Sequence, residues 1–143
     1  MGISYPVGPG TILRCDYSRG GFQAPEMVKA RPAIVISPRL PHRSWLCTVV
    51  PLSGDANEHP SAWDIRIDFN PPLPHPFGNS VAWAKCDMLA TVGFDRLDLF
   101  RTDRDQYGKR KYLHPKISAA DLGRIRDGVL FALGIGNLTL TGE

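Results

Sequence analysis

The sequence contains no long hydrophobic run and no regular cysteine pattern. No apolar stretch approaches the ~20 residues that are needed to cross a bilayer, and the opening residues, MGISYPVGPG, lack the charged start and apolar centre of a signal peptide. Three cysteines stand far apart without a CxxC pair, so neither a disulfide framework nor a zinc site is indicated. We therefore expect a cytoplasmic protein whose cysteines pack as small hydrophobic side chains: Cys15, Cys47 and Cys86.

The sequence also lacks the short motifs of several enzyme classes. None of GxGxxG, GxxxxGK[ST], HExxH and GxSxG occurs, so dinucleotide-binding, P-loop, zinc-protease and α/β-hydrolase functions have no motif support. We expect no cofactor and no metal. The histidines fall in separate loops, each close to a proline, and most should be exposed: His42, His59, His75 and His114. A loop histidine beside a basic patch could still assist proton transfer.

The net charge of +3 is small but unevenly distributed. Residues 1–50 and residues 101–116 each carry six Lys or Arg against two acids, whereas residues 51–100 carry three against seven. Two basic blocks that flank an acidic one could form a phosphate-binding face and an acidic back. That distribution is the electrostatic footprint of a nucleic-acid partner.

At 143 residues and 43% hydrophobic, the chain should form a single domain over residues 1–143. Short apolar segments rich in β-branched residues and bounded by proline or glycine predict strands at 10–17, 32–37, 44–53, 63–69 and 80–92. In 63–69 the apolar residues alternate with Asp64, Arg66 and Asp68, which should form the outer face of a half-buried antiparallel strand. The four prolines of 70–79 predict a stiff loop.

Helical signals occur only near the end of the chain. Ser118 is the predicted N-cap, with Asp121 as its acidic partner, and Gly134 is the predicted C-cap. Gly123 and Gly128 lie inside this helix and should weaken it by about 1 kcal/mol each in an exposed helix interior, so the helix needs the sheet for support. Short strands joined by loops, with one terminal helix, predict a mostly antiparallel small barrel.

Arg31 and Ser53 are the residues that could share a site. Arg31 precedes Pro32, which restricts it to an extended backbone at the start of one strand, and Ser53 ends the next strand. In an antiparallel pair these two positions lie side by side, and a guanidinium with a hydroxyl suits a phosphate group. The alternative is a solvated Arg31 and a Ser53 that merely begins a Ser-Gly-Asp turn.

The ordered segments GTILRCDY, KARPAIVISP, VVPLS and SVAWAKCDMLATV, followed by a C-terminal helix, resemble the PemK/MazF family of toxins from bacterial type II toxin-antitoxin modules. The resemblance spans residues 10–134. It implies an SH3-like small antiparallel β-barrel with a C-terminal α-helix, and a homodimer that inhibits growth by cleaving single-stranded RNA without a metal. It also implies a cognate antitoxin whose tail occupies the RNA groove, and DNA binding together with that antitoxin.

By position, Arg31 matches the family's catalytic arginine, and Ser53 stands where many members have threonine. No residue is assigned as general base. One branch of the family poisons DNA gyrase instead of cutting RNA, so a non-catalytic protein-binding toxin and an inactive relative are the alternatives.

Cations and aromatics near the basic segments are candidate RNA-binding residues. The cations are expected to contact phosphates and the rings to stack on unpaired bases: Lys29, Lys109, Arg110 and Lys111, with Phe22, Tyr107 and Tyr112. Alternatively, Phe22 packs locally, Tyr107 belongs to a hairpin turn, and the GKRKY segment is a solvated loop. Residues 101–116, RTDRDQYGKRKYLHPK, look like an insertion relative to the family.

Overall fold

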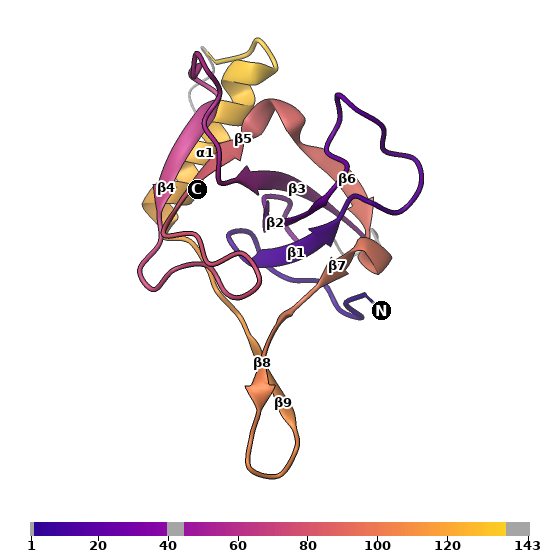
Figure 1. The fold of residues 1–143 in the computed structure, drawn as a ribbon. Helices are drawn as coiled ribbons and strands as arrows, with labels where there is room; N and C mark the ends of the chain where they lie inside the picture. The colour runs from indigo at the N-terminus through magenta and orange to yellow at the C-terminus, as the bar shows by residue number, and fades with distance from the viewer. Residues whose placement is uncertain (1, 40–44, 137–143) are drawn as a thin grey trace.

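The computed structural model describes residues 2–39 and 45–136, which form a mostly antiparallel sheet with a C-terminal helix, as predicted (Figure 1). The strands are β1 (Ile12–Asp16), β2 (Ala30–Val35), β3 (Leu46–Ser53), β4 (Asp64–Asp68), β5 (Val81–Lys85), β6 (Ala90–Gly93), β7 (Leu97–Asp98), β8 (Phe100–Arg104) and β9 (Arg110–Leu113). Two 3-10 turns, η1 (Cys86–Met88) and η2 (Phe94–Arg96), flank β6, and the helix is α1 (Ala119–Ala132).

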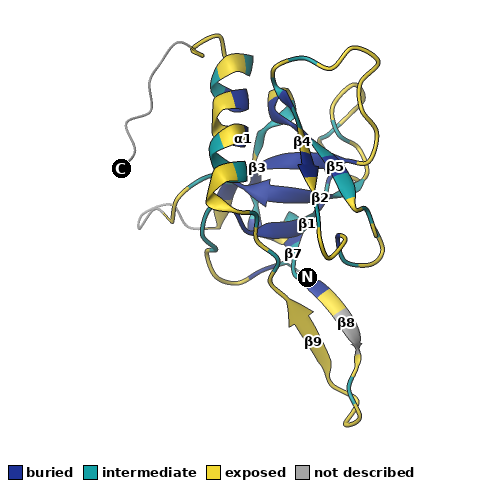
Figure 2. Ribbon diagram, turned by 90° about the vertical axis from the view of Figure 1, so that its left-hand side faces the viewer, coloured by how far each residue is buried: buried dark blue, intermediate teal, exposed yellow. Residues whose placement is uncertain are grey.

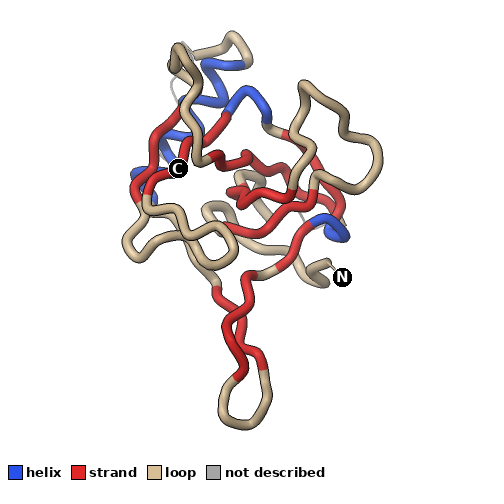
Figure 3. Tube along the Cα trace, in the orientation of Figure 1, coloured by secondary structure: helices blue, strands red, loops and turns tan. Residues whose placement is uncertain are grey.

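Strand β3 organises the sheet, because it pairs with three neighbours. The main order is β4-β5-β3-β2-β1-β7. The first half of β3 pairs with β6, its middle with β2 on the other side, and its last two residues with β5. The strands therefore wrap around a common centre, although no ladder among the described residues joins β4 to β7 to close a barrel (Figures 1 and 3).

The two faces of the sheet cover separate cores, because successive side chains of a strand point to opposite sides. The first face carries Ile12, Ile34, Val50 and Ile67, together with Ile125 of α1. The second face carries the residues next to them in the chain, among them Leu13, Ala33, Val35 and Val49. Figure 2 shows the helix lying against one side of these buried strands.

The ends of α1 follow the predicted capping residues. The Ser118 hydroxyl accepts a hydrogen bond of 3.1 Å from the Asp121 amide. At the other end Gly134 has φ +78°, and the amides of Gly134 and Ile135 donate to the carbonyls of Phe131 and Leu130. These are the two bonds of a Schellman motif, so the predicted N-cap and the predicted capping glycine are confirmed.

Gly128 lets α1 approach the sheet closely. It is buried, and a Cβ atom there would lie 2.9 Å from Cys86 Sγ and 3.1 Å from Ile65 Cγ1. At Gly123, by contrast, no heavy atom lies within 4 Å of the same position. The sequence-based expectation that both glycines simply weaken the helix is therefore incomplete, since Gly128 also makes room for the contact that stabilises it.

One predicted segment differs from the structure, and the segment that looks like an insertion forms regular structure. Residues 80–92 are two strands rather than one, because the chain turns at η1 to leave the end of β3 and pair with its beginning. Residues 101–116 contain the hairpin β8–β9, which projects away from the sheet (Figure 1). Its turn is held by Asp105, whose carboxylate accepts hydrogen bonds from the amides of Tyr107 (2.8 Å) and Lys109 (3.0 Å). Tyr107 thus lies in a hairpin turn, which was the alternative to a stacking role.

The three cysteines are buried and free, which confirms their predicted packing as small hydrophobic side chains. Burial raises the pKa of the Cys15 thiol to about 11 and those of Cys47 and Cys86 to about 12. They are therefore protonated thiols near neutral pH. Within the described ranges, no helix has the length and hydrophobicity that crossing a lipid bilayer requires.

Candidate active site

Arg31 and Ser53 lie at the start of β2 and the end of β3. Arg31 is held by β1, since it lies opposite Cys15 in the β1–β2 ladder. Arg31 as a whole is half-buried. Its Nε atom, however, is fully buried and has no hydrogen-bond partner. Ser53 is 7% exposed, and its hydroxyl oxygen accepts a hydrogen bond of 3.2 Å from the Asp55 amide.

The register puts the two side chains on the same face of the sheet. The last paired position of β2 with β3 is Ala33 opposite Pro51, and Arg31 and Ser53 each lie two residues beyond it. Because side chains alternate, both point to the side that Ala33 and Pro51 face. The β2–β3 ladder ends at Ala33, and Ser53 lies opposite Trp83 of β5 instead. The two polar groups therefore stand where β2 and β3 separate.

The second face of the sheet changes from apolar to polar at this point. Trp83 lies opposite both Ser53 and Arg66, and Lys85 lies opposite Asp64, so these side chains share the face of Arg31 and Ser53. The apolar core of that face lies on β1, β2, β6, β7 and the first half of β3. A polar region thus adjoins the strand ends, in which Arg66 is exposed and Lys85 is buried.

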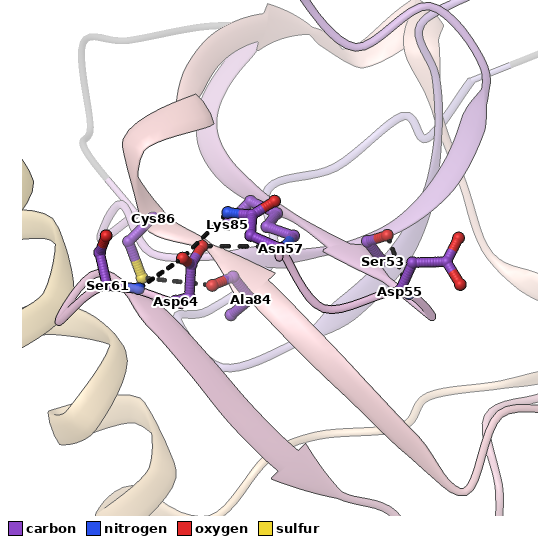
Figure 4. A network of polar contacts seen from close by, with 8 residues as sticks. All are labelled: Ser53, Asp55, Asn57, Ser61, Asp64, Ala84, Lys85 and Cys86. Atoms are coloured by element: carbon purple, nitrogen blue, oxygen red, sulfur yellow. Dashed lines mark hydrogen bonds and ion pairs between the residues drawn. The ribbon is translucent and has the colours of Figure 1, made fainter. Parts of the chain in front are cut away.

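A buried ion pair lies on this polar part. Asp64 Oδ1 is 3.8 Å from Lys85 Nζ, and their side chains are 0% and 6% exposed. The other carboxylate oxygen, Oδ2, accepts hydrogen bonds of 2.9 Å from Asn57 Nδ2 and from the Ser61 amide (Figure 4). These bonds tie the loop that follows Ser53 to the base of β4.

The prediction that Asp64 lies on an outer face is therefore wrong: it is buried, although Arg66 and Asp68 are exposed as expected. Alternation in the sequence identifies the face correctly, but it does not reveal that a lysine at the end of a later strand pairs with the first carboxylate of β4. A lysine within the otherwise apolar segment VAWAKC was the available signal for this pair.

The expected RNA-binding residues near β2 differ in their surroundings. Lys29 is exposed and lies two residues before Arg31. Phe22 is half-buried: its ring makes an edge contact with Tyr17 at 5.3 Å between centroids, and the Arg96 guanidinium lies 4.7 Å from its centroid. This geometry favours the alternative that Phe22 packs locally.

The other expected RNA-binding residues are not brought together with Arg31 and Ser53. Lys109 precedes β9, and Arg110, Lys111 and Tyr112 belong to it. They are exposed on the hairpin. In both orientations the hairpin projects from one end of the molecule, and the β3–β4 loop lies at the other end (Figures 1 and 2).

The histidines of the described part behave as expected. His59, His75 and His114 are exposed loop residues, and His42 lies outside the described residues. Residues 2–39 and 45–136 contain no group of three or more His, Cys, Asp or Glu side chains that could hold a metal ion.

Comparison with a family model identifies the family, and comparison with solved structures identifies the fold. Residues 9–122 match the model of the family described as PemK-like, MazF-like toxin of type II toxin-antitoxin system. The chain is 26% identical over 121 residues to the uncharacterized protein YifN of Escherichia coli K12, covering 73% of this chain and 80% of that protein.

Two solved structures share the fold. The toxin MazF-mt6 of Mycobacterium tuberculosis superposes with a TM-score of 0.55 at 15% identity, covering 86% of this chain and 96% of that one. MazF of Deinococcus radiodurans superposes with a TM-score of 0.59 at 18% identity, covering 91% and 98%.

Proposed function

Since the chain belongs to the PemK-like, MazF-like family of type II toxin-antitoxin toxins, we propose that it is a metal-independent endoribonuclease that cleaves single-stranded RNA. The observation that carries the proposal is the buried, unpartnered Nε of Arg31 on the sheet face that also carries the Ser53 hydroxyl. A buried N–H donor without a partner is costly, and an anion bound at the guanidinium would supply an acceptor.

Arg31 is suited to bind the scissile phosphate. Its guanidinium is permanently charged and offers a planar fork of donors that fits two phosphate oxygens. Two features restrict the backbone conformation of Arg31 and therefore the position of its side chain. Arg31 pairs with Cys15 of β1, and Pro32 follows it in the chain. Arg31 can therefore stabilise the negative charge that grows on the phosphate oxygens as the reaction proceeds.

Ser53 supplies a neutral hydrogen bond to the same phosphate. Its oxygen already accepts from the Asp55 amide, so the hydroxyl hydrogen remains available as a donor. The Asp64–Lys85 pair anchors the following loop through Asn57 and Ser61, which limits the movement of the chain beyond Ser53.

In the proposed reaction the ribose 2′-hydroxyl attacks the adjacent phosphorus in line. A bond forms between the 2′-oxygen and phosphorus, the bond between phosphorus and the 5′-oxygen breaks, and the 2′-hydroxyl proton is lost while the 5′-oxygen gains one. The products are a 2′,3′-cyclic phosphate and a 5′-hydroxyl. With a pKa above about 12, arginine is a poor base, so Arg31 acts by alignment and charge stabilisation.

Family membership also leads us to infer a cognate antitoxin and a homodimer in the cytoplasm. The antitoxin would neutralise the toxin by occupying the RNA groove, and the complex of the two would bind DNA.

The test is incubation of the purified protein with single-stranded RNA in EDTA. We expect cleavage with cyclic-phosphate and 5′-hydroxyl ends, and a loss of ~10²–10³ in rate for Arg31→Ala, which removes a donor to the developing charge. Arg124→Ala, an exposed arginine of α1, is the control and should cleave normally. Intact RNA with the wild-type protein, together with inhibition of DNA gyrase, would assign the chain to a protein-binding toxin instead.

A further inference from the structure

A pocket of about 830 Å³ lies where the hairpin leaves the sheet. Its cationic lining consists of Arg14 of β1, Arg101 of β8 and Arg110 of β9, and Asp98 is the one acid among its lining residues. Asp98 Oδ2 pairs with Arg101 Nη2 at 3.3 Å. The lining therefore keeps an excess of positive charge, and its volume is that of an ordinary small-molecule site.

The hairpin continues this basic surface along one face. Arg101 lies opposite Tyr112, and Arg104 lies opposite Arg110, with a bulge between the two pairs. Directly opposed side chains share a face, and so do residues 110 and 112, which are two apart on β9. Three arginines and one tyrosine thus share one face of the hairpin.

This arrangement opposes the stability of the hairpin itself. Like charges directly opposite each other, as at Arg104 and Arg110, destabilise a strand pair. The hairpin also forms a separate two-stranded sheet, and an isolated sheet of this size is only marginally stable. The Arg104 guanidinium donates a hydrogen bond of 3.2 Å to the Gly108 carbonyl, and an anion bound beside Arg110 would reduce the repulsion between the two cations.

We propose that the pocket and the arginine face of the hairpin bind a second segment of the single-stranded RNA substrate, with phosphates at the arginines and an unpaired base stacked on Tyr112. The proposal rests on the proposed function for the identity of the strand. It adds a binding site on another part of the molecule and makes the hairpin determine how tightly long substrates are held.

The aromatic and apolar groups favour RNA over an acidic protein segment. A carboxylate-rich protein segment would bind through the arginines alone and would have no use for an exposed ring. Tyr112 is 48% exposed among three arginines, and a base can stack on its ring. The pocket wall adds the faces of Pro74, His75 and Leu113. Alternating phosphates and flat bases match this combination.

The second site lies on the other side of the sheet from Arg31. Arg31 pairs with Cys15, and Arg14, the neighbour of Cys15 in β1, points to the opposite face. Only an oligonucleotide long enough to leave the cleavage site and pass the edge of the sheet reaches the hairpin. Short substrates should therefore be cleaved equally well when the hairpin face is altered.

The test is fluorescence anisotropy with a long mixed-sequence 2′-O-methyl RNA oligonucleotide, whose blocked 2′-oxygen prevents cleavage. The variants are Arg101→Gln/Arg110→Gln and Tyr112→Ala. Arg124→Gln is the matched control, because Arg124 pairs with an aspartate three residues before it, as Arg101 does. The N–O distance is 3.1 Å for Arg124 with Asp121 and 3.3 Å for Arg101 with Asp98. Circular dichroism and the melting temperature verify that each variant is folded.

The double variant should bind more weakly and lower the slope of log K against log salt by about 1.4, the loss of two single-strand phosphate contacts. Tyr112→Ala should raise Kd about tenfold, as for one lost stacking contact, while Arg124→Gln binds like wild type. Unchanged binding by both hairpin variants would overturn the proposal. Equal displacement of the RNA by polyglutamate, with no effect of Tyr112→Ala, would also overturn it, because it would indicate a surface for an acidic protein.

This binding assay is independent of the nuclease assay. If the wild-type protein leaves RNA intact while the hairpin variants lose affinity, the second RNA site stands and the nuclease function fails. If the protein cleaves RNA and the hairpin variants bind it normally, only the second site fails.

Discussion

Asp64 and Lys85 form an ion pair of 3.8 Å in which both side chains are buried, and neither Asp64 Oδ1 nor Lys85 Nζ has a hydrogen-bond partner within the described structure. Their mutual attraction compensates part of the cost of removing both charges from water, and removing either partner leaves a buried, unpaired charge. Figure 4 shows that Asp64 also holds Asn57 and Ser61.

Lys85→Met should therefore lower the free energy of unfolding by about 3–5 kcal/mol, because it leaves a buried carboxylate unpaired. Adding Asp64→Asn, which keeps an oxygen to accept from Asn57 and the Ser61 amide, should restore much of that loss. Urea denaturation of the two single variants and the double variant measures the coupling. Strictly additive effects would show that the two residues do not stabilise each other.

Ser53→Ala should reduce kcat/KM for RNA cleavage about 10- to 100-fold, since it removes one hydrogen bond to a charged group. Ser53→Thr should retain most of the activity, because it keeps the hydroxyl. Equal activity of the alanine variant and the wild type would remove Ser53 from the proposed site. Thermal melting of both variants separates this effect from a loss of folding.

Gly128→Ala should destabilise the protein by about 1–3 kcal/mol, because its Cβ would overlap Cys86 Sγ at 2.9 Å and force a shift in the packed interior. Gly123→Ala is the matched control in the same helix, and with open space around it, it should stabilise the protein by about 0.5–1 kcal/mol. Opposite signs in urea denaturation are the expected result. A destabilising Gly123→Ala would contradict the helix-propensity explanation.

Stability should fall as the pH rises above about 9. Burial raises the pKa of the Cys15 thiol from 9.0 to about 11 and that of Cys86 from 9.0 to about 12. The folded state then holds protons that the unfolded state releases, so the stabilisation is complete below pH 9 and is lost as the pH rises through the raised pKa values. Each thiol contributes a loss of up to about 1.4 kcal/mol per pH unit.

Urea denaturation at a series of pH values under reducing conditions measures this slope. Cys15→Ala should flatten the slope above pH 9 relative to the wild type. An identical slope for the two proteins would show that Cys15 has the same pKa in the folded and unfolded states.

The sequence predicts the regular elements well where local signals are strong. β-branched runs bounded by proline or glycine locate β1 to β5, and Ser118 and Gly134 locate the ends of α1. Both kinds of signal depend on neighbours in the chain, so they need no knowledge of the tertiary structure.

The division of residues 80–92 depends on a distant partner, whereas the hairpin depends on a local turn with a weak sequence signal. The turn at Cys86–Met88 is set by β3, which accepts β5 at one end and β6 at the other. The hairpin depends on its turn, where Asp105 accepts two amide hydrogen bonds and Gly108 has φ +78°. Asp-Gln-Tyr-Gly is a weaker sequence signal than a two-residue turn such as Asn-Gly.

For the proposed site, residue type and strand position lead from the sequence to Arg31 and Ser53 as candidates. The sequence misses the Asp64–Lys85 pair, since a buried charge is defined by its partner across the sheet rather than by its neighbours in the chain. The proximity of the hairpin base to Arg14 is likewise a tertiary relationship.

The hairpin β8–β9 pairs with no strand of the main sheet, and of its described side chains only that of Phe100, at the base, is buried (Figure 2). Substitutions toward its tip therefore leave both cores untouched. Such a segment can change in sequence or length over evolution while the rest of the molecule keeps its stability.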